Sequence, residues 1–300
     1  MIALDRRDPG PGGNEQAGPP SDRQNFFRRT ASALVLAPLA IGAAFAGGWT
    51  FAAACTVTAA LVLWEWSILV SRAADWRILA PGVPALCAAA VLAQGNSPGM
   101  AIAAVALGAV GAAVATGVAP QGERRSARSA FWAAAGVFYA GIVLISPIVL
   151  RSDPQMGFAA LAFLFATVWA TDIFAYLTGR SLGGPLLAPR LSPKKTWTGA
   201  VGGLAGGVVA GSLVAYASAG TSPVAAGVLA LILSIAAQGG DLLESSVKRR
   251  FGAKDTSALI PGHGGVMDRV DGFLVAALIA TVIGALRFGA AASARGLLLW

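Results

Sequence analysis

The most constraining feature of this chain is a series of long apolar runs that contain almost no charged residues. Charged residues make up 12% of the 300 residues, about half the share found in soluble domains, and the mean hydropathy is +0.69. A water-soluble fold has too little interior to bury so much apolar surface, and disorder of the whole chain would require low hydrophobicity. The sequence therefore predicts an integral membrane protein.

Each predicted span approaches the roughly 20 helical residues that a bilayer core requires. The nine spans lie near residues 30–47, 50–70, 78–94, 98–118, 130–150, 157–178, 199–219, 222–245 and 272–290. The runs are continuous and do not alternate with a period of two, which disfavours a transmembrane β-barrel. We expect an all-α polytopic membrane protein of about nine transmembrane helices, built from residues 26–300. Residues 1–25 are polar and rich in Pro and Gly, which predicts a disordered cytoplasmic tail without a cleavable signal peptide.

The basic residues predict the orientation of these helices. With the N-terminus in the cytoplasm, 19 of the 22 basic residues fall on the inside, and only Arg151, Arg287 and Arg295 fall outside. We expect a multi-pass protein of the cell (inner) membrane with its C-terminus outside. Because the basic residues separate apolar spans and form no continuous basic face, the net charge of +8 does not indicate nucleic-acid binding. Cys55 and Cys87 lie in apolar runs and are expected to be buried.

The acidic residues point to a functional site. Asp241 and Glu244 stand three residues apart at the end of the eighth span, and Asp268 and Asp271 have the same spacing before the ninth. Helical spacing places each pair on one face. An acid within a membrane span is costly and therefore suggests a function. For Glu65, inside the second span, a packing role neutralised by a neighbouring Lys or Arg is an equal alternative.

The segment 239–272 combines these acids with cations and glycines. Lys248, Arg249 and Lys254 follow the first acidic pair, and a glycine-rich turn at 261–265 precedes the second. Carboxylate oxygens suit a hard cation such as Mg²⁺, and basic side chains and glycine N–H groups suit phosphates. This combination indicates metal-assisted phosphoryl chemistry. His263, the only histidine, fits phosphate binding or proton transfer, although a surface role is the simpler alternative.

A second segment, residues 171–199, has a similar character. Ser192, Lys194, Lys195 and Thr196 stand just before a predicted helix, where an anion is favoured, but they would also serve as a simple positive anchor. Asp172 lies nearby and requires a partner. Glycines every four residues, at 199, 203, 207 and 211, predict close helix packing, and no P-loop motif is present.

Taken together, these residues resemble a known family. The segment Ser246-Val247-Lys248-Arg249, then Lys254-Asp255, then the run from Pro261 to Asp271 is similar to the signature of the phosphatidate cytidylyltransferases, also called CDP-diacylglycerol synthases. The resemblance is strong from about 160 to 275, which we expect to be the catalytic part. It also covers the Glu65 segment. One departure is Thr198, where the family usually has an acid.

The resemblance implies that the protein transfers CMP from CTP to phosphatidic acid in the membrane, with Mg²⁺ and possibly a second cation. It implies metal binding by Asp241, Asp268 and Asp271. It assigns the catalytic chemistry to these three and to Glu244, Lys248, Arg249, Lys254 and Arg269. It assigns substrate binding to Asp172, Ser192, Lys194, Lys195, Thr196, Ser246, His263, Gly264 and Gly265. The resemblance also suggests a homodimer.

Two alternatives are weighed against this hypothesis. A cation-coupled transporter would spread its acids through the helices on an inverted repeat, whereas here they cluster near one predicted membrane face. Another CTP-dependent lipid enzyme, such as a polyprenol kinase, would share the phosphate chemistry, but the unbroken signature argues against it.

Overall fold

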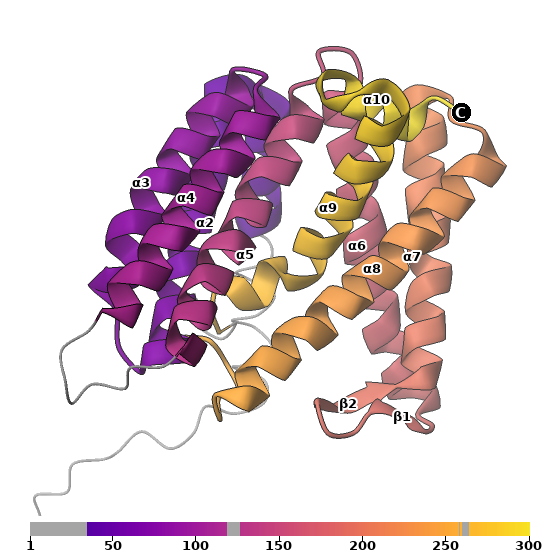
Figure 1. Cartoon of the computed structure of the whole chain (residues 1–300). Helices are drawn as coiled ribbons and strands as arrows, with labels where there is room; N and C mark the ends of the chain where they lie inside the picture. The colour runs from indigo at the N-terminus through magenta and orange to yellow at the C-terminus, as the bar shows by residue number, and fades with distance from the viewer. Residues whose placement is uncertain (1–34, 119–126, 258, 260–263) are drawn as a thin grey trace, which may run out of the picture.

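Long helices that run up and down form the protein (Figure 1). The computed structural model describes residues 35–118, 127–257, 259 and 264–300. The predicted tail, residues 1–25, and His263 lie outside the described residues, as does the start of the first predicted span. That span continues as the helix Val35–Ala46.

Eight helices are long and apolar enough to cross a membrane. They are α2 (Gly48–Ser71), α3 (Trp76–Gln94), α4 (Pro98–Gly117), α5 (Ala127–Arg151), α6 (Gly157–Leu182), α7 (Trp197–Ala219), α8 (Pro223–Arg250) and α9 (Met267–Phe288). The predicted helical membrane class is confirmed, and each of these helices matches one predicted span. The chain ends in a short turn, η1 (Ala290–Ala292), and the helix α10 (Ser293–Leu298).

Three features differ from the sequence-based expectation. The helix α8 continues five residues beyond the predicted end at 245, and α9 begins five residues before the predicted start at 272. Glu244, in the last turn of the predicted eighth span, is buried inside the protein and so does not face lipid. The third feature is a small antiparallel hairpin, β1 (Leu186–Ala188) with β2 (Ser192–Thr196), between α6 and α7.

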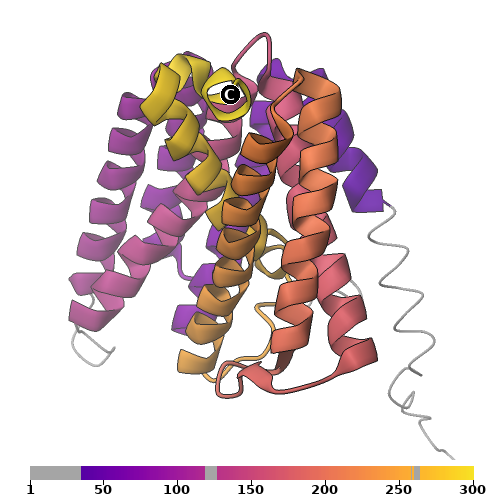
Figure 2. The ribbon, with the colours of Figure 1, turned by 90° about the vertical axis from the view of Figure 1, so that its right-hand side faces the viewer.

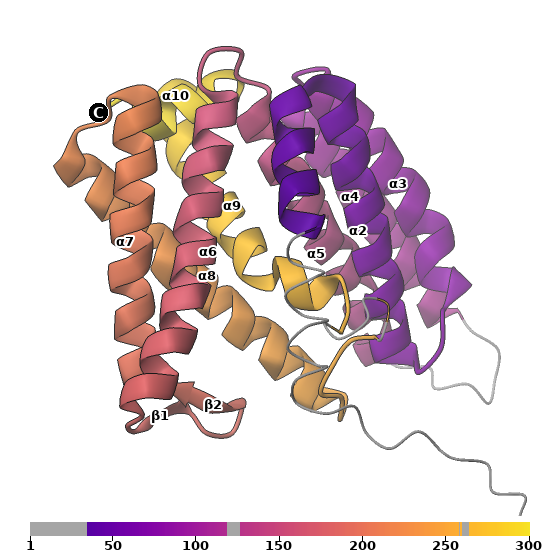
Figure 3. The ribbon, with the colours of Figure 1, turned by 180° about the vertical axis from the view of Figure 1, so that it is seen from behind.

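The helices form two groups with α9 between them. Helices α2–α5 pack together on one side and α6–α8 on the other, as seen from the front and from behind (Figures 1 and 3). The helix α9 packs against α8, α5, α6 and α2, so it contacts both groups. Figure 2 shows the hairpin below α6 and α7, at the same end as the C-terminal end of α8. This end of the molecule is called the hairpin end below.

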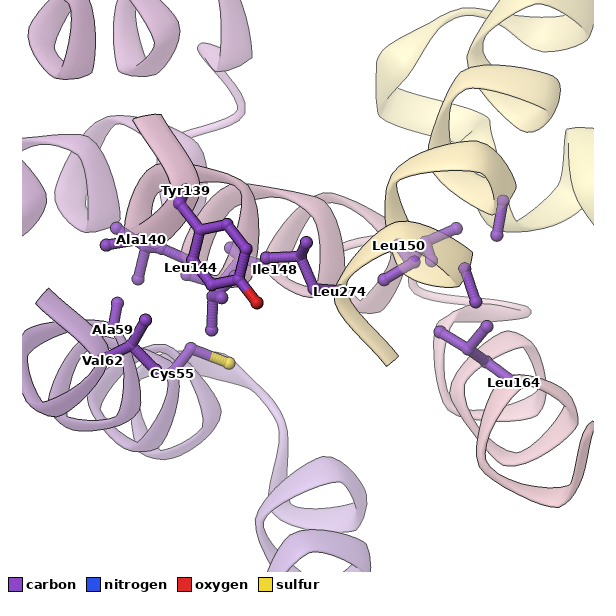
Figure 4. Packing of buried hydrophobic residues seen from close by; sticks show 14 of the residues in the cluster. Cys55, Ala59, Val62, Tyr139, Ala140, Leu144, Ile148, Leu150, Leu164 and Leu274 are labelled. Atoms are coloured by element: carbon purple, nitrogen blue, oxygen red, sulfur yellow. The ribbon is translucent and has the colours of Figure 1, made fainter. Parts of the chain in front are cut away.

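Buried side chains pack between α2 and α5 and continue toward α9. Tyr139 and Leu144 of α5 face Cys55 and Val62 of α2, and Leu274 of α9 lies beyond them (Figure 4). The prediction of buried cysteines is correct for Cys55 and wrong for Cys87, which is exposed on α3. An apolar span has an outward face as well as an inward one, and hydropathy does not distinguish them.

The glycine repeat brings α6 and α7 close together, as predicted. A Cβ at Gly203 would lie 2.8 Å from the Thr171 carbonyl oxygen, and one at Gly199 would lie 2.8 Å from that of Ala175. Real Cβ atoms do not approach so closely, so larger residues would push the two helices apart.

At the opposite end, a buried acid ties α10 to the connection between α5 and α6. Asp153 is fully buried, and its Oδ2 accepts hydrogen bonds from Nε and from the backbone amide of Arg295, at 3.0 and 3.2 Å. Its Oδ1 accepts from the Gln155 amide at 3.0 Å. Burial by itself raises the pKa of Asp153, but these hydrogen bonds together outweigh it and hold that pKa below its ordinary value.

Candidate active site

Three carboxylates from two helices converge near the hairpin end. Asp241 and Glu244 lie on one face of α8, and Asp271 lies in the second turn of α9. One oxygen from each lies within 4.8 Å of those of the other two. The close approach depends on Gly240, because a Cβ there would lie 2.5 Å from the Asp271 carbonyl oxygen. We call Asp241, Glu244 and Asp271 the acidic group.

The acidic group fits a divalent cation. Its donors are carboxylate oxygens, which hard cations such as Mg²⁺ prefer. Glu244 is 1% exposed, and its Oε1 has no hydrogen-bond partner among the described residues. Because an unpaired carboxylate oxygen is expensive to bury, this atom is suited to accept a cation or a cation-bound water.

One lysine joins the acidic group to the second predicted pair. Lys248 Nζ lies 2.8 Å from Glu244 Oε2 and 2.6 Å from Asp268 Oδ1, and its side chain is 12% exposed. A single cation therefore neutralises two largely buried carboxylates, one on α8 and one on α9. Lys248 holds the two helix ends together at the point where the acids meet.

Asp268 lies outside the acidic group, although the sequence analysis placed it among the metal ligands. Its Oδ2 accepts from the Gly265 amide at 2.8 Å and from the amide and hydroxyl of Thr256 at 3.2 and 3.0 Å. Both oxygens are thus engaged by Lys248 and by the segment before α9. Metal binding by Asp268 stays a prediction.

The hairpin brings a second lysine to the acidic group. Lys195 on β2 forms an ion pair with Asp241 Oδ2. The next residue, Thr196, caps α7, since its Oγ1 accepts from the Gly199 amide at 3.1 Å. The prediction that these residues precede a helix is correct. Ser192 pairs with Ala188 at the start of β2, and Lys194 is exposed on the same strand.

The other predicted residues surround this centre. Arg249 is exposed and donates to the carbonyl oxygens of Leu191 and Ala253 at 3.4 and 3.3 Å, so it links α8 to the hairpin. Ser246 donates to the Leu243 carbonyl oxygen at 2.7 Å. Lys254, Arg269 and Asp172 are exposed, and Asp172 interacts electrostatically with Asp241, Lys195 and Arg269. Gly264 has a φ of +81°, a conformation that favours glycine.

Comparisons with known proteins identify the family of the chain. A family model described as the cytidylyltransferase family matches residues 27–286. The chain belongs to the cytidylyltransferase family. Over 155 residues it is 54% identical to a protein named phosphatidate cytidylyltransferase from Brucella abortus biovar 1 (strain 9-941), which covers 52% of this chain and 57% of that protein.

Two further relatives carry the same name. The protein from Haemophilus influenzae is 40% identical over 144 residues, or 46% of this chain and 50% of the relative. The protein from Mycobacterium leprae is 39% identical over 150 residues, or 49% of this chain and 48% of the relative. The aligned part of the chain thus spans about half the length of these relatives.

In this member of the cytidylyltransferase family, sequence reasoning left three residues near the site unassigned. Glu65 of α2 is fully buried and accepts a hydrogen bond from the Ser257 hydroxyl, between α8 and α9, and its Oε2 lies 3.3 Å from Thr256 Oγ1. The signal for Glu65 was its position as an acid inside an apolar run. Nothing local marks Thr256 or Ser257, because their partners are about 190 residues away in sequence.

Thr198, which stands where the family usually has an acid, is engaged locally. Its Oγ1 donates to the Gly183 carbonyl oxygen and lies 3.0 Å from Thr196 Oγ1. It therefore joins the end of α6 to the start of α7 without adding negative charge near Lys195.

Proposed function

We propose that this protein is a phosphatidate cytidylyltransferase, which transfers CMP from CTP to phosphatidic acid and releases pyrophosphate. The observation that carries the proposal is the acidic group with Lys195 and Lys248, at one end of a bundle of apolar helices. Carboxylates for a cation and ammonium groups for phosphates are the requirements of phosphoryl transfer. Family membership and the names of the relatives support the same reaction.

The reaction requires little covalent participation by the protein. A phosphate oxygen of phosphatidic acid attacks the α-phosphorus of CTP, the bond from that phosphorus to the α–β bridging oxygen breaks, and pyrophosphate leaves. The nucleophile is already anionic near neutral pH, so no strong base is needed. The protein has to hold the two phosphates in line and balance their charge.

The residue roles follow from the geometry. Asp241, Glu244 and Asp271 would hold Mg²⁺, and Asp268 stays a further candidate ligand; a second cation is part of the same proposal. When bound, such a cation neutralises charge on the phosphates and orients them.

Lysines on either side would contact the anionic substrates. Lys195 reaches the acidic group from the hairpin, and Lys248 reaches it from α8. Further phosphate contacts are proposed for Ser192, Lys194, Thr196, Ser246, Arg249, Lys254, His263, Gly264, Gly265 and Arg269, with Asp172 at the edge of the site.

The same proposal places the hairpin end at the cytoplasmic face of the cell (inner) membrane, where CTP is available. It includes residues 1–25 as a cytoplasmic tail and 160–275 as the catalytic part of one membrane domain. It also includes a homodimer and excludes a nucleic-acid partner.

The orientation is tested by cysteine labelling in a Cys55→Ala/Cys87→Ala background. Arg190→Cys, exposed after β1, should react with an impermeant maleimide from the cytoplasm only, and Gln155→Cys, exposed between α5 and α6, from outside only. Labelling from the reverse sides would contradict the proposed orientation.

The activity is tested with purified full-length protein, CTP, phosphatidic acid and Mg²⁺. We expect CDP-diacylglycerol and pyrophosphate in equal amounts, and loss of both on chelation of the metal. Asp271→Asn should abolish turnover without preventing membrane insertion. Folded wild-type protein that makes no CDP-diacylglycerol would refute the proposal. Product from a polyprenol substrate, or cation transport without turnover, would favour the alternatives, which family membership does not support.

A further inference from the structure

A carboxylate from the N-terminal group of helices holds the start of α9. Glu65 of α2 is fully buried, and each of its oxygens accepts one backbone amide and lies near one hydroxyl. The Val266 and Met267 amides donate at 2.8 and 2.7 Å to Oε1 and Oε2 respectively. Ser257 Oγ donates to Oε1 at 2.6 Å, and Thr256 Oγ1 lies 3.3 Å from Oε2.

These contacts satisfy the hydrogen-bonding capacity of a buried carboxyl group. The amides belong to the first positions of α9, where N–H groups lack partners within the helix and an anion is favoured. The four groups belong to residues 256, 257, 266 and 267, and none belongs to α2 itself. Glu65 therefore fixes the positions of these four residues relative to α2.

A continuous polar path connects Glu65 to the acidic group. The hydroxyl of Thr256 lies between Glu65 and Asp268 Oδ2, at 3.3 and 3.0 Å. Asp268 Oδ1 contacts Lys248, which in turn contacts Glu244. The start of α9 also carries Asp271, a member of the acidic group, one helical turn after Met267. Any shift of this helix end would move Asp268 and Asp271 relative to α8.

The surrounding residues are shaped for this arrangement. A Cβ at Gly265 would overlap Thr256 Oγ1 and lie 2.6 and 2.7 Å from the two Glu65 oxygens. The end of α2 contacts the beginning of the same connection, since Arg72 Nη2 donates to the Phe251 carbonyl oxygen at 2.8 Å. The helix α2 thus contacts the connection between α8 and α9 near both of its ends.

From this geometry we infer that Glu65 is a positioning residue for the active site: it holds the N-terminus of α9 so that Asp268 and Asp271 face Lys248, Asp241 and Glu244. The effect of Glu65 on catalysis rests on the proposed function. The positioning of α9 does not depend on it. Of the two roles that the sequence left open for Glu65, the geometry favours the one at the site, because the carboxyl group contacts amides and hydroxyls of residues that lead into α9.

The test compares Glu65→Gln with Asp153→Asn. Both remove the charge of a fully buried carboxylate that accepts backbone amides, but Asp153 lies at the opposite end of the molecule. In Glu65→Gln, the side-chain NH₂ group replaces one carboxylate oxygen, so the backbone amide and hydroxyl that face this position lose their acceptor. We expect a kcat/KM that is about 10–100-fold lower and a higher Mg²⁺ concentration for half-maximal activity, as for residues that orient metal ligands. Asp153→Asn should lower the Tm but leave the Mg²⁺ dependence unchanged.

Hydrogen exchange provides a readout that needs no turnover. Amides 264–268 should exchange faster in Glu65→Gln than in the wild type and should be unchanged in Asp153→Asn. Ser257→Ala removes one donor and should shift both readouts in the same direction by a smaller amount, which keeps the test open if Glu65→Gln does not fold.

The inference is overturned if folded Glu65→Gln or Ser257→Ala retains wild-type exchange and Mg²⁺ dependence, or if Asp153→Asn reproduces the same changes. If the wild-type protein has no cytidylyltransferase activity, but amides 264–268 still exchange faster in Glu65→Gln, the proposed function is refuted. The positioning of α9 by Glu65 would then still stand.

Discussion

At the scale of single residues, the charged side chains of this protein are distinguished by their partners more than by their type. Asp268 and Asp271 lie three residues apart, yet Asp268 is held by Lys248, Thr256 and Gly265, whereas Asp271 faces two other carboxylates. The spacing of the acids predicted two pairs on helix faces. Which acids meet follows from the packing of α8 on α9, which brings Asp271 to Asp241 and Glu244 and leaves Asp268 at Thr256 and Gly265.

The first prediction concerns this lysine. Lys248→Met leaves Glu244 and Asp268 without their shared counter-charge, and leaving one partner of a buried pair alone costs about 3–5 kcal/mol. We expect a clear fall in the Tm of the detergent-purified protein and a loss of activity. Lys254→Met, at an exposed position in the following connection, is the control for charge removal and should leave the Tm unchanged. Equal Tm values for the two variants would contradict the bridging role.

At the scale of helices, glycines set the distances that bring the acids together. Sequence reasoning identified the stripe at 199, 203, 207 and 211 because its period is regular, and α6 and α7 do pack through it. The contact between α8 and α9 depends instead on Gly240, whose neighbour Gly239 is exposed. A sequence of two adjacent glycines does not indicate which one faces a partner helix.

The second prediction uses this pair of glycines. Gly240→Ala would force its Cβ against the Asp271 carbonyl oxygen and separate α8 from α9, so we expect lower stability and a large loss of activity. Gly239→Ala has no neighbour within 4 Å and should be neutral or stabilising by up to about 1 kcal/mol through helix propensity. Tm and turnover measurements on both variants check this. Tolerance of Gly240→Ala, or damage from Gly239→Ala, would contradict the packing described for α8 and α9.

The helix ends show where hydropathy is an insufficient guide. The spans predicted to end near 245 and to begin near 272 belong to longer helices, because α8 continues to Arg250 and α9 starts at Met267. The reason is that Glu244 and Lys248 contact other charged groups inside the protein and gain nothing from leaving the helix. The hairpin and α10 are short, lack a strong period, and are stabilised by contacts to distant residues, so the sequence pattern did not predict them.

At the scale of the whole molecule, the two ends carry different sets of charged residues. Three basic residues predicted to lie outside, Arg151, Arg287 and Arg295, contact residues of the Val35–Ala46 helix, α10 and the 152–156 connection. The lysines and acids of the candidate site lie at the hairpin end. These three basic residues thus lie at the end opposite the candidate site, and which end faces the cytoplasm stays part of the proposal.

The third prediction concerns stability at the end opposite the site. Because the pKa of Asp153 is held below its ordinary value, its ion pair and hydrogen bonds stabilise the folded state above the ordinary Asp pKa of about 3.9. This contribution is lost as the pH falls through the lower, folded-state value. Asp153→Asn should therefore lower stability by about 1–3 kcal/mol near pH 7, and the difference from wild type should shrink below about pH 4. Tm measurements against pH on both proteins test this, and a constant difference down to pH 3 would contradict it.

The sequence by itself determined the class of the protein, the positions of eight described spans, and the segments that carry the site. These follow from the length of apolar runs, the scarcity of charge and the family signature, which are local along the chain. Only the tertiary structure decided that Glu244 joins Asp241 and Asp271, that Asp268 pairs with Lys248, and that Glu65 holds α9 from across the bundle. Those outcomes depend on contacts between residues up to about 200 positions apart, where helix packing and glycine placement set which side chains meet.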